Sequence, residues 1–163
     1  EDDGIVDRIL TWERDSDRRH VGFFIDSDAD GEIDEHSVFA YDEAGNRISE
    51  SVDFDSDGVD DQVAVWTYDA EGNRTNETVY FQGVAEQIST FSYDERGYLV
   101  GETFDMWADG FLESQLTYAY DDDGNRISES LDAVGDGISD YETTLIYETV
   151  SNWAAFLPND RES

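Results

Sequence analysis

Large apolar residues alternate with small or polar residues along most of the chain, with a period of two. One apolar column contains Phe39, Trp66, Phe91, Tyr118 and Leu145, and a second, two residues later, contains Tyr41, Tyr68, Tyr93, Tyr120 and Tyr147. The positions between them hold Ala40, Thr67, Ser92, Ala119 and Ile146. Because successive side chains of a strand point to opposite faces, both apolar columns are predicted to share one face of a β-sheet.

The segments that follow each column carry their own apolar residues at the same alternation. These are Ile48, Val52, Val79, Phe104, Ile127 and Leu131. The first unit fits the same frame, with Trp12 in the first column and Val21 and Ile25 on its return segment. Successive segments of this kind predict an antiparallel meander of hairpins with one buried face.

Two kinds of turn punctuate the meander. Glycines of the first kind stand at Gly4, Gly31, Gly58, Gly83, Gly110 and Gly137, which are 25 or 27 residues apart. The second kind has a Tyr-Asp-x-x-Gly pattern that ends at Gly45, Gly72, Gly97 and Gly124 and is typical of hairpin turns. A fixed period of this length indicates tandem repeats, so residues 1–163 are predicted to form one repeat domain. The two turn types are expected at opposite edges of the sheet, and residues 151–163 are expected to cap its end.

The predicted fold class is therefore all-β, an antiparallel meander of hairpin repeats of about 27 residues. A single open layer would leave the aromatic columns exposed to solvent, so we expect the sheet to curl into a barrel-like or flattened two-layer structure. The alternative is an open, twisted segment of a larger shell.

The turns of the first kind carry acidic residues at regular positions. Two loops have carboxylates at positions 1, 3, 5 and 9 and glycine at position 6: Asp26, Asp28, Asp30 and Asp34, then Asp53, Asp55, Asp57 and Asp61. Short loops of this kind wrap oxygen ligands around Ca²⁺, which takes six to eight of them, whereas Mg²⁺ prefers fewer protein ligands. The alternative is that Asp and Gly occur in these loops only because they favour solvent-exposed turns, without binding a metal.

Two further loops keep positions 1, 5 and 9 but have Trp107 or Val134 at position 3. Their candidate ligands are Asp105, Asp109 and Glu113, and Asp132, Asp136 and Asp140. The loop at Gly83 lacks the leading acids, so it is expected to hold no metal. The loop at Gly4 keeps Asp3 and Asp7.

The charged composition of the chain limits the partners that it is expected to bind. The chain has 42 Asp plus Glu against nine Arg and no Lys, giving a net charge of −33. Phosphate backbones and anionic membranes would be repelled, so neither nucleic acid binding nor membrane insertion is expected. The acidity is consistent with cation binding and with a salt-adapted surface. There are no cysteines, so no disulfide framework is expected. The chain starts at Glu1 rather than Met, so we expect that a leader or upstream sequence was removed. An extracellular or cell-surface location is expected because calcium loops of this kind fill outside the cell.

Two resemblances follow from these motifs. The Tyr-Asp-x-x-Gly-Asn-Arg turns within residues 41–130 resemble the YD repeats of the Rhs family, which implies hairpins that spiral into a hollow β shell enclosing another polypeptide. The acidic loops resemble the Asp-x-Asp-x-Asp-Gly calcium loops of thrombospondin type 3 repeats, which implies bound Ca²⁺. An EF-hand is excluded because Ser37 and Ala64 stand at position 12, where a Glu is required.

A further acidic column, Glu50, Glu77, Glu102 and Glu129, is interpreted as cross-strand partners of Arg47, Arg74 and Arg126 rather than as catalytic acids. The expected function is a calcium-binding, calcium-stabilised secreted or cell-surface repeat module with a structural or adhesive role and no catalysis. Its expected partners are Ca²⁺, an extracellular polymer or neighbouring repeats. The alternatives are a segment of an Rhs-type shell and a carbohydrate-binding module that uses the aromatic columns.

Overall fold

The computed structural model of the protein describes residues 7–147, and this part contains eleven β-strands and no helix. The strands are β1 (Ile9–Arg14), β2 (His20–Asp26), β3 (Glu35–Tyr41), β4 (Arg47–Asp53), β5 (Gln62–Tyr68), β6 (Arg74–Phe81), β7 (Val84–Tyr93), β8 (Leu99–Asp105), β9 (Ser114–Tyr120), β10 (Arg126–Asp132) and β11 (Tyr141–Thr144). Since the described residues form no helix, they include none that could cross a membrane. The expected cap at residues 151–163 and the loop at Gly4 lie outside the described residues.

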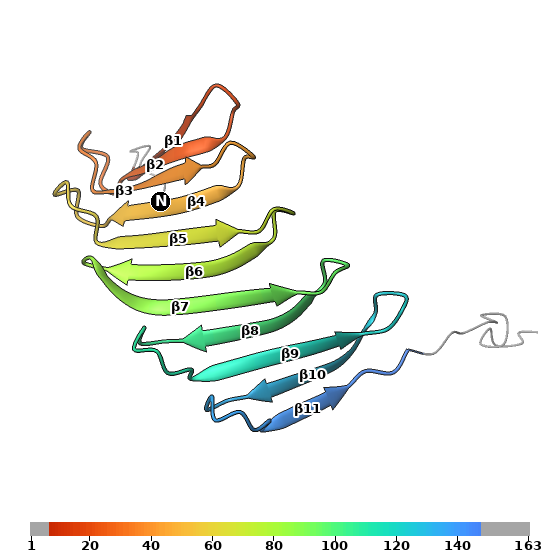
Figure 1. Ribbon diagram of the computed structural model, residues 1–163. Coiled ribbons are helices and arrows are strands. Elements are labelled where there is room, and N and C mark those ends of the chain that lie inside the picture. Colours follow the sequence, from red (N-terminus) through yellow and green to blue (C-terminus); the bar gives the residue numbers. More distant parts are fainter. Residues whose placement is uncertain (1–6, 148–163) are drawn as a thin grey trace, which may run out of the picture.

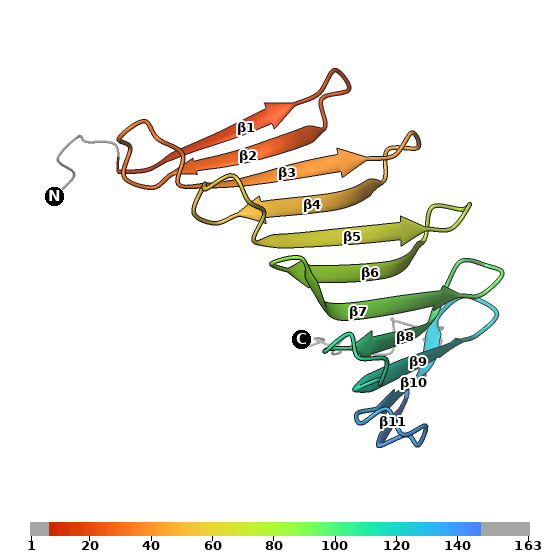
Figure 2. The same cartoon turned by 60° about the vertical axis from the view of Figure 1, so that its left-hand side comes forward.

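All eleven strands form one sheet in which each strand pairs antiparallel with the next along the chain. This confirms the predicted all-β meander. The expected closure into a barrel-like or two-layer structure is wrong for residues 7–147, because β1 and β11 each pair with a single neighbour and the sheet stays open. Figures 1 and 2 show a single twisted layer, as in the alternative expectation.

The two kinds of turn lie at opposite edges of this sheet. The Tyr-Asp turns connect β3 to β4, β5 to β6, β7 to β8 and β9 to β10, at the right-hand edge in Figure 1. Gly45 and its counterparts there have φ between +83° and +93°, a region that only glycine enters without strain. The acidic loops connect the strands at the left-hand edge, where β6 and β7 are instead joined by the short turn Gln82–Gly83.

The aromatic columns share one face with the acidic column, as the register shows. Phe39, Trp66, Phe91 and Tyr118 stand directly opposite Glu50, Glu77, Glu102 and Glu129, respectively. We call this side of the sheet the aromatic face. Its small and aliphatic positions include the buried residues Ile25, Val52 and Ala64.

Arginine side chains cover the aromatic face in place of a second layer. The Arg47 guanidinium lies 4.7 Å from the ring centre of Trp66 and 5.3 Å from that of Phe39, and only 7% of Trp66 is exposed. Arg74 covers Phe91 in the same way. Cation–π contacts and the apolar stems of these side chains shield the rings. This is why the sheet need not close, contrary to the expectation from the aromatic columns.

The predicted Arg–Glu pairs form, but within one strand rather than across two. Arg47 lies 3.5 Å from Glu50, and the Arg74–Glu77 and Arg126–Glu129 pairs have the same spacing and distance. A β-bulge explains the difference. Tyr41 pairs with Arg47 and Ala40 with Ser49, so one extra residue places Arg47 on the same face as Glu50.

Candidate metal-binding loops

The loop of residues 26–34 is closed by its own first and last carboxylates. Asp26, the last residue of β2, accepts hydrogen bonds from the amide N–H groups of Asp30 and Gly31 at 3.2 and 2.9 Å. Asp34 accepts one from the amide of Ser27 at 2.6 Å, and its own amide donates to the carbonyl of Ile25. These bonds wrap the backbone around the carboxylates at the mouth of the β2–β3 hairpin.

The loop of residues 53–61 repeats this geometry between β4 and β5. Asp53 accepts from the amide of Gly58 at 2.8 Å, and Asp61 accepts from the amide of Phe54 at 2.9 Å. The amide of Asp61 donates to the carbonyl of Val52. Equivalent sequence positions therefore make equivalent bonds in both loops, as expected for repeats of one structural unit.

Glycine at position 6 is required by the backbone. Gly31 and Gly58 have φ of +97° and +89°. A second left-handed residue, at position 4, was not foreseen from the sequence: Ala29 and Ser56 have φ of 58° and 53°. The small residue at this position in each acidic loop was the available signal, since non-glycine residues adopt positive φ only at a cost.

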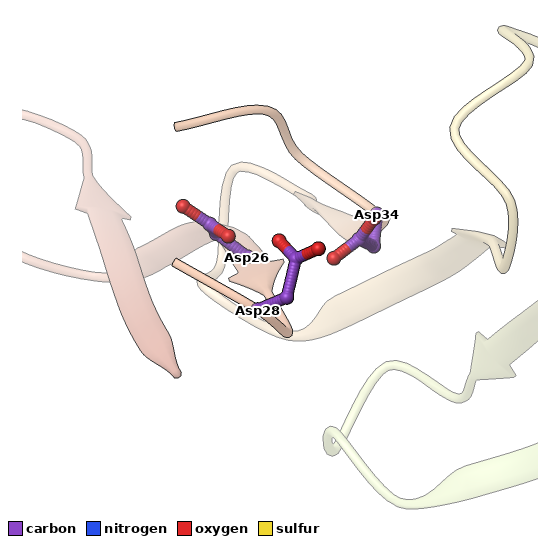
Figure 3. A group of neighbouring side chains, drawn as sticks. All are labelled: Asp26, Asp28 and Asp34. Carbon is purple, nitrogen blue, oxygen red and sulfur yellow. The ribbon is translucent and has the colours of Figure 1, made fainter. Parts of the chain in front are cut away.

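Three carboxylates converge in each of these two loops. Oxygen atoms of Asp26, Asp28 and Asp34 all lie within 4.8 Å of one another, and those of Asp53, Asp55 and Asp61 do the same. Figure 3 shows the first group, with the carboxylate of Asp28 between those of Asp26 and Asp34.

The candidates at position 5 are not part of these groups. Asp30 accepts a hydrogen bond from the amide of Glu32 at 2.9 Å, and Asp57 accepts one from the amide of Val59 at 2.8 Å. The structure thus brings together positions 1, 3 and 9 of each loop. A position-5 carboxylate would have to exchange its amide partner to join them.

The first carboxylate of the second loop is buried yet held in its charged form. Asp53 is 1% exposed. Burial acts to raise its pKa, but the amide donors of Gly58, Asp55 and Asp57, together with His36, outweigh burial and leave the pKa of Asp53 below its usual value. A charged Asp53 beside two other carboxylates favours binding of a cation, because like charges at this separation repel by about 1 kcal/mol per pair even in water.

The loops of residues 105–113 and 132–140 have the same backbone bonds but fewer carboxylates. Asp105 and Asp132 accept from the amides of Gly110 and Gly137 at 2.9 and 2.6 Å. The position-3 residues, Trp107 and Val134, are 68% and 64% exposed. Within residues 7–147, neither loop brings three metal-ligating side chains together. Asp109, Glu113, Asp136 and Asp140 therefore lie in loops whose carboxylates do not converge in threes.

The two convergent groups fit Ca²⁺ by the chemistry of their donors. Hard oxygen ligands on a flexible loop, with carbonyl groups and water completing six to eight ligands, are what Ca²⁺ takes. Asp26 is the last residue of β2 and Asp34 directly precedes β3, so an ion held by both would tie the end of β2 to the start of β3.

A second set of aspartates, in the Tyr-Asp turns, was not singled out from the sequence. Asp69 accepts from the amide and from the side-chain Nδ2 of Asn73, at 2.8 and 2.9 Å. Asp42 and Asp121 make the same two bonds with Asn46 and Asn125. The bond from the Asn73 side chain is the largest influence that lowers the pKa of Asp69. The Asp-x-x-Gly-Asn spacing was the signal for these structural aspartates.

No protein-family model matches the chain, and no curated protein matches it. Solved structures similar to it include the crystal structure of TcdB2-TccC3, with 16% sequence identity over 74% of this chain and 8% of that chain and a TM-score of 0.33. Another is a protein of unknown function from Bacteroides fragilis, with 12% identity over 85% of this chain and 91% of that chain and a TM-score of 0.25. At these TM-scores neither likeness carries an argument about fold or function.

Proposed function

We propose that this chain is a calcium-binding, calcium-stabilised repeat module with a structural or adhesive role outside the cell and without catalysis. The observation that carries the proposal is the convergence of Asp26, Asp28 and Asp34, repeated 27 residues later by Asp53, Asp55 and Asp61. The resemblance of these loops to thrombospondin type 3 repeats supports the same function. The resemblance of the Tyr-Asp turns to YD repeats supports the alternative, a segment of an Rhs-type shell.

Calcium would act on the edge of the sheet that carries the acidic loops. Without the ion, the three carboxylates of each loop repel one another and favour fraying of the adjacent strand ends. A bound ion removes this repulsion and links two strands. Since the folded loop binds the ion and the unfolded chain does not assemble it, stability rises with the ratio of free calcium to the dissociation constant.

The charge and the loop type both favour an extracellular setting. Loops of this kind in extracellular modules bind Ca²⁺ at about 10⁻⁴ to 10⁻³ M, concentrations that are found outside the cell. Two ions would leave most of the net charge of −33 in place, which keeps the module hydrated and soluble. An extracellular polymer and neighbouring repeats are the proposed partners.

Thermal unfolding in chelator and in about 1 to 10 mM Ca²⁺ tests the proposal, at constant high NaCl so that general screening is fixed. We expect a calcium-specific rise in Tm that is abolished in the double variant Asp28→Ala with Asp55→Ala. The matched control is Asp60→Ala with Asp123→Ala, which removes the same charge from exposed positions outside the two groups. A rise no larger than that caused by sodium at equal ionic strength would overturn the proposal.

A further inference from the structure

On the side of the sheet opposite the aromatic face, β4 to β10 have uncharged side chains at their interior paired positions. We call these positions, without the strand-end residues Asp53, Asp105 and Asp132, the back face. Its residues are Ser49, Ser51, Val63, Val65, Thr67, Asn76, Thr78, Tyr80, Ile88, Thr90, Ser92, Gly101, Thr103, Gln115, Thr117, Ala119, Ser128 and Ser130. None of them is ionisable at neutral pH, in a chain whose residues are 31% charged.

Three aspartates end strands on this side, but they belong to the loops. The carboxylates of Asp53, Asp105 and Asp132 accept hydrogen bonds from loop amides and are 1%, 5% and 7% exposed. Glu50, Glu77 and Glu129 lie on the aromatic face and pair there with arginines, and Glu102 on the same face accepts a hydrogen bond from the Tyr118 hydroxyl. The back face is therefore a neutral strip bordered by acidic loops.

Hydrogen-bonding side chains line up in rows across this strip. Thr67, Asn76, Thr90, Thr103 and Gln115 stand directly opposite one another on five consecutive strands. Neighbouring strands of a sheet are about 4.8 Å apart, so the row offers hydroxyl and amide groups at a short, regular spacing. Thr90 and Thr117 are exposed, and Gln115, Thr117 and Ser130 line a shallow hollow at the β9–β10 end of the strip. Such a strip fits an extended partner.

We propose that the back face docks an uncharged, hydroxyl-rich polysaccharide. Its rows of hydroxyl and amide groups can donate to and accept from sugar hydroxyls, and Val63, Val65 and Ile88 offer aliphatic contact to the sugar C–H faces. When an uncharged polymer binds this strip, neither surface carries a charge whose hydration would be lost. An anionic polymer is repelled by the bordering loops, and a cationic one is drawn to those loops instead of the back face.

A second copy of the chain fits the strip less well. Two molecules with a net charge of −33 each would have to bring their acidic loops together. Tyr80 is the one aromatic residue in the strip, which has no arginine, whereas several aromatic and arginine anchors dominate protein interfaces. The proposal does not rest on calcium binding, because no residue of the back face belongs to the metal-binding groups.

Co-sedimentation of the full chain with insoluble uncharged polysaccharides (cellulose, chitin, mannan and β-1,3-glucan) tests the proposal, in both calcium and chelator. We expect retention by at least one of them, weakened about tenfold or more in Thr90→Glu with Thr117→Glu, because a charge buried against a neutral polymer is unpaired. Ala44→Glu with Ala70→Glu adds the same charge at exposed Tyr-Asp turns and is expected to leave retention unchanged.

Three results would overturn the proposal. The first is that the wild-type chain sediments with none of these polymers. The second is that Thr90→Glu with Thr117→Glu binds as well as Ala44→Glu with Ala70→Glu while both variants have wild-type melting curves. The third is a concentration-dependent dimer, seen by sedimentation equilibrium, that the back-face variant alone abolishes. Polysaccharide binding is expected to persist in Asp28→Ala with Asp55→Ala under conditions where that variant is folded. Failure of the back-face proposal can therefore be told apart from failure of the calcium proposal.

Discussion

The hydroxyl of Tyr68 donates a 2.7 Å hydrogen bond to the main-chain carbonyl of Arg47, 21 residues earlier in the chain. Arg47 begins β4 and Tyr68 ends β5, so the bond closes this strand pair at the edge where no turn connects the two strands. The acidic loop of residues 53–61 closes the same pair at the other edge. Tyr41, Tyr93 and Tyr120 make the same bond to His20, Arg74 and Leu99, which explains why tyrosine recurs at this position.

Replacing Tyr68 with Phe is expected to lower the free energy of unfolding by about 1 kcal/mol, the usual net value of a hydrogen bond whose acceptor is left without its partner. Equilibrium unfolding in urea measures this as a lower midpoint at an unchanged slope. Tyr80→Phe is the control, because the Tyr80 hydroxyl makes no hydrogen bond within the described residues. Equal midpoints for the two variants would show that the Tyr68 bond does not stabilise the sheet.

Completing an incomplete loop is expected to add a calcium site. Trp107→Asp supplies the missing position-3 carboxylate beside Asp105 and Glu113, and it costs little packing because Trp107 is mostly exposed. We expect isothermal titration calorimetry to show one more bound Ca²⁺ than in the natural chain. Phe111→Asp adds the same charge to the same loop at position 7 and is expected to add no ion. An unchanged stoichiometry in Trp107→Asp would contradict the assignment of ligand positions.

Two turn glycines separate the cost of a left-handed backbone from the cost of a side-chain clash. Gly72 and Gly124 have φ of +88° and +85°, so alanine at either position costs about 1 kcal/mol or more. A Cβ at Gly72 meets open space, whereas one at Gly124 overlaps the ring and hydroxyl of Tyr98. Tyr98 stacks on Tyr120 with ring centres 4.9 Å apart, so it cannot move freely.

Gly124→Ala is therefore expected to destabilise the protein by about 1 kcal/mol more than Gly72→Ala, the lower range for forced overpacking. Urea unfolding of the two variants beside the natural chain gives the difference directly. If both variants lose the same stability, the Tyr98 side chain moves away from the added Cβ without loss of stability, and its stacking on Tyr120 does not contribute to the free energy of unfolding.

The strands and turns could be predicted from the sequence because both signals are local. The alternation around Phe39 and Tyr41 fixes which side chains share a face, and the glycines at positive φ mark the turns. Closure could not be predicted, since it depends on what covers the aromatic columns. The bulge between Ala40 and Tyr41 turns Arg47 onto that face, and nothing in the alternation pattern indicates an extra residue in β4.

The metal-binding loops were predictable to a similar extent. Spacing alone identified positions 1, 3, 5 and 9, because acidic residues recur there in two repeats. It could not show that Asp57 uses its carboxylate to accept from the amide of Val59 while Asp55 turns towards Asp53 and Asp61. That choice depends on the left-handed backbone at Ser56 and Gly58, which sets the direction of each amide.

Loss of stability in acid is the last expected consequence, and Asp132 is the best place to measure it. Burial acts to raise the pKa of Asp132, but the amides of Gly137, Val134, Gly135 and Asp136 outweigh burial and lower it. A carboxyl whose pKa is lower in the folded state contributes stability above its unfolded pKa, about 3.9, and loses it as the pH falls through the folded pKa.

In chelator, where no ion competes for the carboxylates, the free energy of unfolding is expected to fall as the pH drops below about 4. Asp132→Asn removes one titrating group, so its urea midpoint is expected to depend less steeply on pH between about 2 and 5. Asp60→Asn, at an exposed aspartate that accepts no hydrogen bond within residues 7–147, is expected to keep the natural slope. Equal slopes in all three proteins would mean that the loop amides do not hold the Asp132 carboxylate in its charged form, and the same reasoning would then fail for Asp53.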